Sequence, residues 1–111
     1  MKATLAAFAH ACDGRLVGAD APFSGVSTDS RTVNAGELFV ALSGPRFNGE
    51  DYVGAAVARG AAGAVVRTAQ AAARSQILVD DTLAALASGA HAWREGFAIP
   101  VVGVEIGRAH V

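Results

Sequence analysis

Short apolar segments bounded by glycines and turn residues alternate with helical segments in the second half of the chain, and this alternation restricts the fold more than any other feature. Short apolar runs of this kind are typical of buried strands. The predicted strands cover residues 37–42, 64–66, 76–79 and 99–104, and the predicted helices between them cover 50–59, 68–74 and 82–96. Strands joined by helices form a mainly parallel sheet that helices cover on both faces. We therefore expect an α/β fold, a three-layer domain with a mainly parallel or mixed sheet.

The first half of the chain carries weaker signals of the same kind. Residues 4–12 place apolar side chains at helical spacing, with Thr4 as the expected N-cap. Gly14 is the expected stop, because glycine is common just past a helix. Residues 15–18 and 23–29 are expected to form two further strands.

Composition excludes several classes of protein. The formal net charge of the 111 residues is −1, so the basic excess of a nucleic-acid-binding domain is absent. Hydrophobic residues make up 52% of the chain and charged residues 17%, which argues against a disordered chain. The apolar stretches are far shorter than the roughly 20 residues that span a bilayer. A single cysteine, Cys12, allows no internal disulfide. We expect a cytoplasmic protein with no nucleic-acid or membrane partner.

A polar cluster at residues 27–31 follows one of the predicted strands. It offers three hydroxyls, the Asp29 carboxylate and the Arg31 guanidinium. In open α/β sheets, ligands bind beyond the carboxyl ends of strands. Hydroxyls suit a uracil or a sugar, and an arginine suits a phosphate or carboxylate. The same residues also fit a turn in which Arg31 pairs with Asp29, and spacing alone favours that interpretation.

A second candidate is the loop at residues 44–49. Two glycines frame it and would let the backbone approach a ligand closely, while Phe47 could stack on a base. The loop is not a phosphate-binding P-loop, because no Gly-Lys-Ser/Thr follows. Without other information, the favoured interpretation is a plain strand-to-helix connection with Asn48 as a turn or cap residue.

No catalytic residue, metal site or cofactor is expected within the chain. The three histidines lie far apart in the sequence, without acidic or cysteine neighbours at ligand spacing. Cys12 lies on an apolar helix face and is expected in the core. Asp80 and Asp81 precede the predicted helix 82–96, where capping explains both.

The apolar stripe of that helix is expected to comprise Leu83, Leu86, Ala87, Ala90, Trp93 and Phe97.

Taken together, the motifs resemble the N-terminal domain of the Mur ligases over residues 1–104. The matching segments are GVSTDSR at 25–31, GELFVAL at 36–42 and GPRFNGEDY at 44–52, followed by GAAGAVV at 60–66 and VDDT at 79–82. No single segment is as specific as the whole set in this order.

The resemblance implies a function. The most similar Mur ligases join D-alanyl-D-alanine to UDP-N-acetylmuramoyl-tripeptide in the cytoplasm, using ATP and magnesium. Their product serves peptidoglycan biosynthesis, and so the cell wall, cell shape and cell division. The first of their three domains holds the UDP end of the nucleotide substrate, the second binds ATP, and the third binds the incoming dipeptide. Residues 1–104 are accordingly expected to be the UDP-substrate-binding domain of an acid–amino-acid ligase, working as a monomer.

The resemblance also implies roles for particular residues. Thr28 and Ser30 match uridine contacts of the family. The second uridine-contact loop corresponds to Pro45, Arg46 and Phe47. Supporting positions in the two motifs are Ser27, Asp29, Arg31 and Asn48.

The chain departs from the family pattern after Val104. Where Mur ligases continue into a Thr-Gly-x-x-Gly-Lys-Thr ATP loop, residues 105–111 read Glu-Ile-Gly-Arg-Ala-His-Val. We expect the 111 residues alone to be inactive as a ligase, because the ATP site is missing. One of the many possible back-translations of these seven residues, GAG ATC GGA AGA GCA CAC GTC, contains the start of a common short-read sequencing adapter. We therefore expect 105–111 to be foreign to the natural protein, an expectation that independent genomic reads test.

Two alternatives to this function stay open. One is the sister ligase that adds the third amino acid to UDP-N-acetylmuramoyl-dipeptide. Those ligases carry His-Gln-Ala at the second loop, where this chain has Pro45, Arg46 and Phe47. The other is a free-standing, non-catalytic binding module, which would have no affinity for UDP-sugars.

Overall fold

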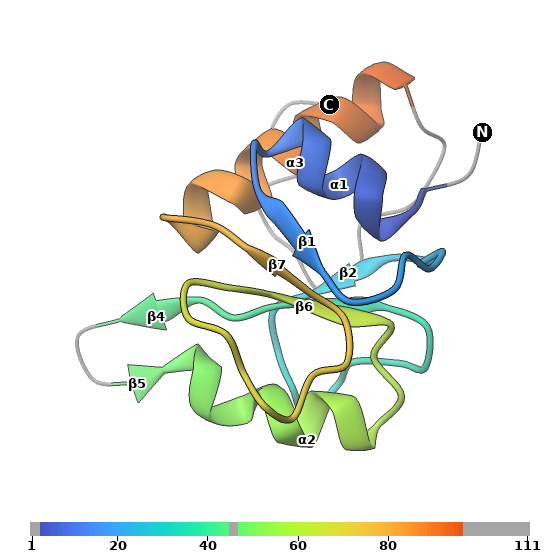
Figure 1. The fold of residues 1–111 in the computed structure, drawn as a ribbon. Helices are drawn as coiled ribbons and strands as arrows, with labels where there is room; N and C mark the ends of the chain where they lie inside the picture. Colours follow the sequence, from blue (N-terminus) through green and yellow to red (C-terminus); the bar gives the residue numbers. More distant parts are fainter. Residues whose placement is uncertain (1–2, 45–46, 97–111) are drawn as a thin grey trace.

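The computed structural model describes residues 3–44 and 47–96, and in this part of the chain five strands form one sheet (Figure 1). The strands are β1 (Arg15–Val17), β2 (Val26–Ser27), β3 (Leu38–Val40), β6 (Gly63–Val66) and β7 (Gln76–Leu78), and their spatial order is β1-β7-β6-β3-β2. Strands β2, β3, β6 and β7 run parallel, and β1 pairs antiparallel with β7. The predicted α/β fold with a mainly parallel, mixed sheet is confirmed.

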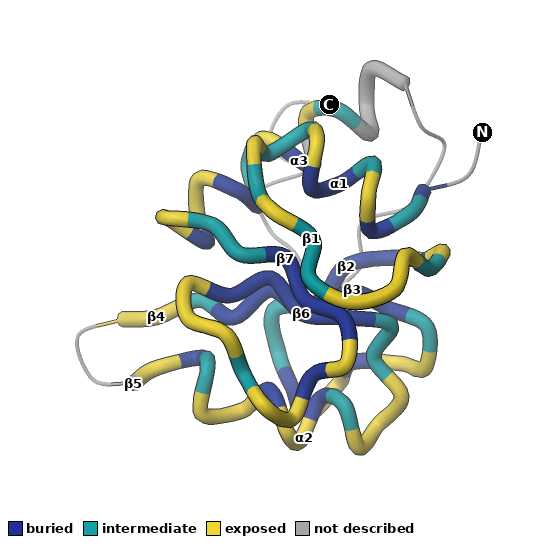
Figure 2. Tube along the Cα trace, viewed as in Figure 1, coloured by how far each residue is buried: buried dark blue, intermediate teal, exposed yellow. Residues whose placement is uncertain are grey.

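Helices cover the two faces of this sheet. On one face lie α1 (Leu5–Ala11) and α3 (Thr82–Gly96), and on the other lies α2 (Val53–Ala58) (Figure 1). The first hydrophobic cluster, around Phe8 and Ile77, fills the α1/α3 side, and the second, around Phe39 and Val53, fills the α2 side. Figure 2 shows the buried strands between these layers. Burial on both faces explains why β3 and β6 contain only apolar residues and glycine.

The first helix begins as its sequence predicts. The Thr4 side chain accepts a hydrogen bond from the Ala7 amide, and Asp20 Oδ1 accepts another from the Ala6 amide at 2.9 Å. The end of α1 differs in detail from the prediction. Asp13, with φ of 60°, takes the left-handed position expected of Gly14. Gly14 is needed for space instead, because a Cβ there would lie 2.7 Å from the Ile77 side chain.

The predicted helix at 68–74 is wrong. The segment forms turns and bends between β6 and β7, and two side chains from outside it bind its backbone. The Glu50 carboxylate accepts hydrogen bonds from the amides of Arg67 and Thr68 at 2.5 and 2.9 Å. The buried Gln76 amide accepts from the Gln70 amide and donates to the Gln70 carbonyl. In a helix over 68–74 the Gln70 carbonyl would accept from the Arg74 amide, but here it accepts from the Gln76 side chain.

Other elements are shorter or divided differently than predicted. Only Val26–Ser27 of the expected strand 23–29 pairs in the sheet. The expected loop at 44–49 contains the short antiparallel strands β4 (Ser43–Gly44) and β5 (Phe47–Asn48). The expected helix 50–59 begins as a 3₁₀ turn, η1 (Gly49–Tyr52), and continues as α2.

The last helix starts at Thr82, and Asp81 rather than Asp80 caps it by accepting from the amides of Leu83 and Ala84. Leu83 was expected on the buried stripe but is 57% exposed, whereas Leu86 is buried as predicted. The predicted strand 99–104 and the tail 105–111 lie outside the described residues. Among the helices that are described, none has both the length and the apolar character needed to cross a bilayer.

Candidate functional site

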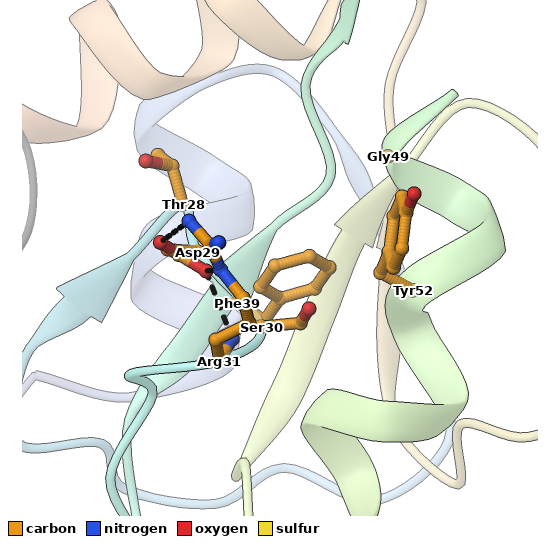
Figure 3. A pocket seen from close by; sticks show the side chains of 7 residues that line it. All are labelled: Thr28, Asp29, Ser30, Arg31, Phe39, Gly49 and Tyr52. Carbon is orange, nitrogen blue, oxygen red and sulfur yellow. Dashed lines mark hydrogen bonds and ion pairs between the residues drawn. The ribbon is translucent and has the colours of Figure 1, made fainter. Parts of the chain in front are cut away.

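A cavity of about 410 Å³ opens where the loop after β2 faces the start of the η1–α2 segment (Figure 3). It lies beyond the carboxyl end of β2, the place where ligands bind in open α/β sheets. Its volume falls within the usual range of small-molecule sites. The lining residues are Thr28, Asp29, Ser30, Arg31, Phe39, Gly49 and Tyr52.

One wall of the cavity is the polar loop 28–31, which is held in a turn by its own side chains. The Ser27 hydroxyl, buried beneath the loop, bonds to the Asp29 backbone at 3.2 Å. Asp29 Oδ1 accepts from the Arg31 backbone amide at 2.9 Å. Two further amides, those of Thr32 and Val33, donate to the Asp29 carbonyl. The loop is therefore a preformed turn.

Asp29 and Arg31 form a two-pronged ion pair within this turn. Arg31 Nε donates to Asp29 Oδ1 at 3.1 Å, and Arg31 Nη2 lies 3.0 Å from Asp29 Oδ2. The hydrogen bond from the Arg31 side chain lowers the pKa of the Asp29 carboxyl to about 2. The Arg31 side chain is 86% exposed, so its guanidinium remains at the surface beside the cavity. The pairing that spacing favoured is present, in a loop that also lines a cavity.

The opposite wall and the base of the cavity are aromatic. Phe39 of β3 is almost fully buried and reaches the cavity between the two walls (Figure 3). Tyr52, at the end of η1, stands across the cavity from Asp29 and Arg31. Gly49 contributes backbone, and a Cβ at this position would lie 2.1 Å from the Leu42 carbonyl oxygen. The cavity thus combines hydroxyls and an ion pair on one side with an aromatic ring on the other.

The predicted site residues separate into three groups. Thr28, Ser30, Asp29 and Arg31 line the cavity as expected. Ser27 and Asn48 have structural bonds, since Asn48 Oδ1 caps η1 at the Glu50 amide and accepts from the Ser43 hydroxyl. For the second predicted loop, Pro45 and Arg46 lie outside the described residues, and only the backbone of Phe47, in β5, is described.

Sequence reasoning missed three lining residues, namely Phe39, Gly49 and Tyr52. All three belong to the motifs quoted above. Their positions predict a strand residue, a turn glycine and a helix residue, and none of these indicates contact with a ligand. No group of three or more metal-ligating side chains occurs within residues 3–44 and 47–96, and the cavity walls offer hydroxyl and aromatic contacts instead.

The ion pair gives a testable titration. We expect the Asp29 carboxyl to titrate at about pH 2, below its ordinary value of 3.8, because the Arg31 side chain stabilises the ionised form. The fold lowers this pKa, so its stabilising contribution is full above pH 3.8 and is lost as the pH falls toward 2. Carbon NMR of the side-chain carboxyl measures the pKa directly.

Arg31→Gln should return the Asp29 pKa toward 3.8, while Arg74→Gln, at an exposed position of the loop between β6 and β7, should leave it near 2. A wild-type titration near 3.8 would show that the pair is not formed in solution.

Comparison with known proteins assigns the family. The model of the "Mur ligase family, catalytic domain" matches residues 22–94, about two thirds of the chain. The match includes the polar loop, Gly49 and Tyr52. The chain therefore belongs to the Mur ligase family.

Individual relatives point to two kinds of ligase. The UDP-N-acetylmuramoyl-tripeptide–D-alanyl-D-alanine ligase of Synechocystis sp. is 36% identical over 88 residues, which cover 77% of this chain and 19% of that enzyme. The UDP-N-acetylmuramoyl-L-alanyl-D-glutamate–2,6-diaminopimelate ligase of Gloeobacter violaceus is 47% identical over 47 residues, covering 42% of this chain and 10% of that enzyme. The chain thus spans about a fifth or less of the curated relatives it matches.

The fold agrees with the sequence comparison. The crystal structure of MurF from Acinetobacter baumannii superimposes with a TM-score of 0.77 at 30% identity, over 88% of this chain and 22% of that protein. The similarity extends over nearly the whole described domain.

Proposed function

We propose that this chain is the part of a D-alanyl-D-alanine-adding Mur ligase that binds the uridine end of UDP-N-acetylmuramoyl-tripeptide. One observation carries the proposal: the polar motif at 28–31 and the Gly49–Tyr52 turn, distant in sequence, line a single cavity of ligand size. Hydroxyls at Thr28 and Ser30 suit the polar edge of a uracil or the ribose. Residues 1–104 act as this domain, in a protein that works in the cytoplasm as a monomer.

The ligation itself needs residues outside this chain. ATP-dependent ligation requires phosphate-binding groups, and the lysine of a Gly-Lys-Ser/Thr loop is the usual one. The only lysine of the 111 residues is Lys2, which lies in no such motif. We propose that the chain binds nucleotide substrate weakly and releases no ADP from ATP, with ATP, magnesium and D-alanyl-D-alanine handled by the remainder of the enzyme.

Calorimetry with UDP-N-acetylmuramoyl-tripeptide tests the binding proposal. The wild-type chain should bind, and Thr28→Ala combined with Ser30→Ala should weaken binding about tenfold, since each lost hydrogen bond costs roughly 0.5–1.5 kcal/mol. Ser88→Ala, an exposed serine on α3, is the matched control and should bind like wild type. Equal affinity of all three proteins would show that the side chains of the polar loop do not bind the substrate.

The diaminopimelate-adding ligase is a second candidate, favoured by the identity of 47% over 47 residues to the Gloeobacter enzyme. Both enzymes act on UDP-N-acetylmuramoyl substrates, so the affinity of this domain for UDP does not separate them. Ligation assays on the complete enzyme do. ADP release that requires the tripeptide substrate and D-alanyl-D-alanine supports the first proposal, and release that requires the shorter substrate and a diamino acid supports the second.

A further inference from the structure

Tyr52 is an exposed aromatic side chain that faces the cavity. Its exposed fraction is 47%, and within the described part of the chain the only other large apolar side chain with such exposure is Leu83. A large aromatic side chain gains most of its stabilising effect when it is buried. Tyr52 leaves about half of that surface in solvent, beside a cavity of ligand size.

The backbone that carries Tyr52 is firmly held. The Glu50 carboxylate ties η1 to the loop after β6 through the Arg67 and Thr68 amides, and Asn48 caps the first turn. Directly after Tyr52, Val53 is only 1% exposed within the second hydrophobic cluster. The ring is therefore presented by a fixed turn, which limits the entropy lost when a ligand binds.

The cavity has the shape and chemistry for a flat ring. Figure 3 shows the Tyr52 ring edge-on, with one of its faces turned toward the polar loop. The Ser30 hydroxyl lies across the cavity from it, and the Phe39 ring lies between the two walls. A planar heterocycle placed there would have the Tyr52 ring against one face and the hydroxyl-bearing loop 28–31 on its other side.

We infer that the Tyr52 ring is the stacking surface for the pyrimidine base of the nucleotide, with the loop 28–31 on the opposite side of that base. This inference rests on the proposed function, because it assumes that the uridine end enters this cavity. Tyr52 then sets affinity through the face of its ring, and its hydroxyl is not required.

The sequence offers a direct probe, because Tyr52 is the only tyrosine of the chain. Its ring signals in an NMR spectrum are therefore assigned without ambiguity. The ring current of Tyr52 should move the uracil H5 and H6 signals of bound UDP upfield, and titration of the 111-residue chain with UDP should also shift these tyrosine signals. Ribose 5-phosphate, which has no base, should leave them unchanged.

Affinity measurements complete the test. Tyr52→Phe keeps the ring and should bind UDP within about twofold of wild type. Tyr52→Ala should bind roughly 5- to 150-fold more weakly, the range found when a base loses an aromatic partner. Leu83→Ala is the matched control, since it removes the other exposed apolar side chain and should have no effect.

The outcomes separate this inference from the proposed function. UDP binding by Tyr52→Ala with the wild-type affinity, or unmoved tyrosine signals at saturating UDP, would overturn the stacking role while leaving the domain a UDP binder. No UDP binding by the wild-type chain would overturn both. If Tyr52→Ala does not fold, Tyr52→Leu and the wild-type ring shifts decide the question.

Discussion

Gly49→Ala should lower the free energy of unfolding by about 3 kcal/mol and the melting temperature by more than roughly 10 °C. A Cβ at Gly49 would lie 2.1 Å from the Leu42 carbonyl oxygen and 2.8 Å from the Ala41 carbonyl carbon. These are backbone atoms at the end of a central strand, so no side-chain rotation relieves the overlap. Thermal and urea unfolding measure the loss.

Gly54→Ala is the matched control for this variant. Gly54 lies in α2, it is exposed, and a Cβ there would meet only the Ala72 methyl at 3.8 Å. Alanine is favoured over glycine in a helix by up to about 1 kcal/mol, so this change should leave stability unchanged or raise it. Equal effects of the two substitutions would show that η1 does not lie against the end of β3 as described.

Gln76→Leu is expected to destabilise the domain by about 2–4 kcal/mol. Gln76 is 6% exposed, and its amide group bonds to the Gln70 amide, the Gln70 carbonyl and the Ala73 carbonyl. Leucine has nearly the same volume but satisfies none of these backbone groups, and each buried unsatisfied group costs about 1–3 kcal/mol. Urea unfolding gives the loss, and faster hydrogen exchange at the Gln70 amide locates it.

Gln70→Ala is the control that shows whether any substitution in the loop between β6 and β7 lowers stability as much as Gln76→Leu does. The Gln70 side chain bonds to Glu50 Oε1 and the Thr68 carbonyl, while its backbone remains bound by Gln76. Its removal should cost about 1 kcal/mol or less. A Gln70→Ala loss as large as that of Gln76→Leu would contradict the role given to the buried amide.

The fold could be predicted from the sequence wherever local signals and burial agree. The apolar strand around Leu38–Val40 is central, and Thr4 caps the first helix as predicted. The failures arise from contacts distant in the chain. Nothing local shows that the Glu50 carboxylate binds the amides of Arg67 and Thr68, 17 and 18 residues away. The alanine-rich segment 68–74 therefore has the local composition of a helix, although side chains outside the segment hold it in turns.

The candidate site divides in the same way. The loop 28–31 could be found from its polar residues after a strand, and the Asp29–Arg31 pair from their spacing. Tyr52 could not be found, because an aromatic residue at the start of a helix usually packs inward. The structure places it at the last position of η1, where 47% of its surface is exposed. The predicted burial of Leu83 is wrong for a similar reason, because this residue lies in the first turn of α3 beside an open cavity.

The central claim is that the uridine end of a nucleotide substrate enters the cavity between loop 28–31 and η1. Amide NMR of the isotope-labelled chain during UDP titration tests it most directly. The account predicts saturable shifts concentrated at residues 28–31 and Gly49–Tyr52, with little change at the separate cavity lined by Arg67, Asp80 and Asp81. Shifts confined to that second cavity, or no shifts at millimolar UDP, would contradict it.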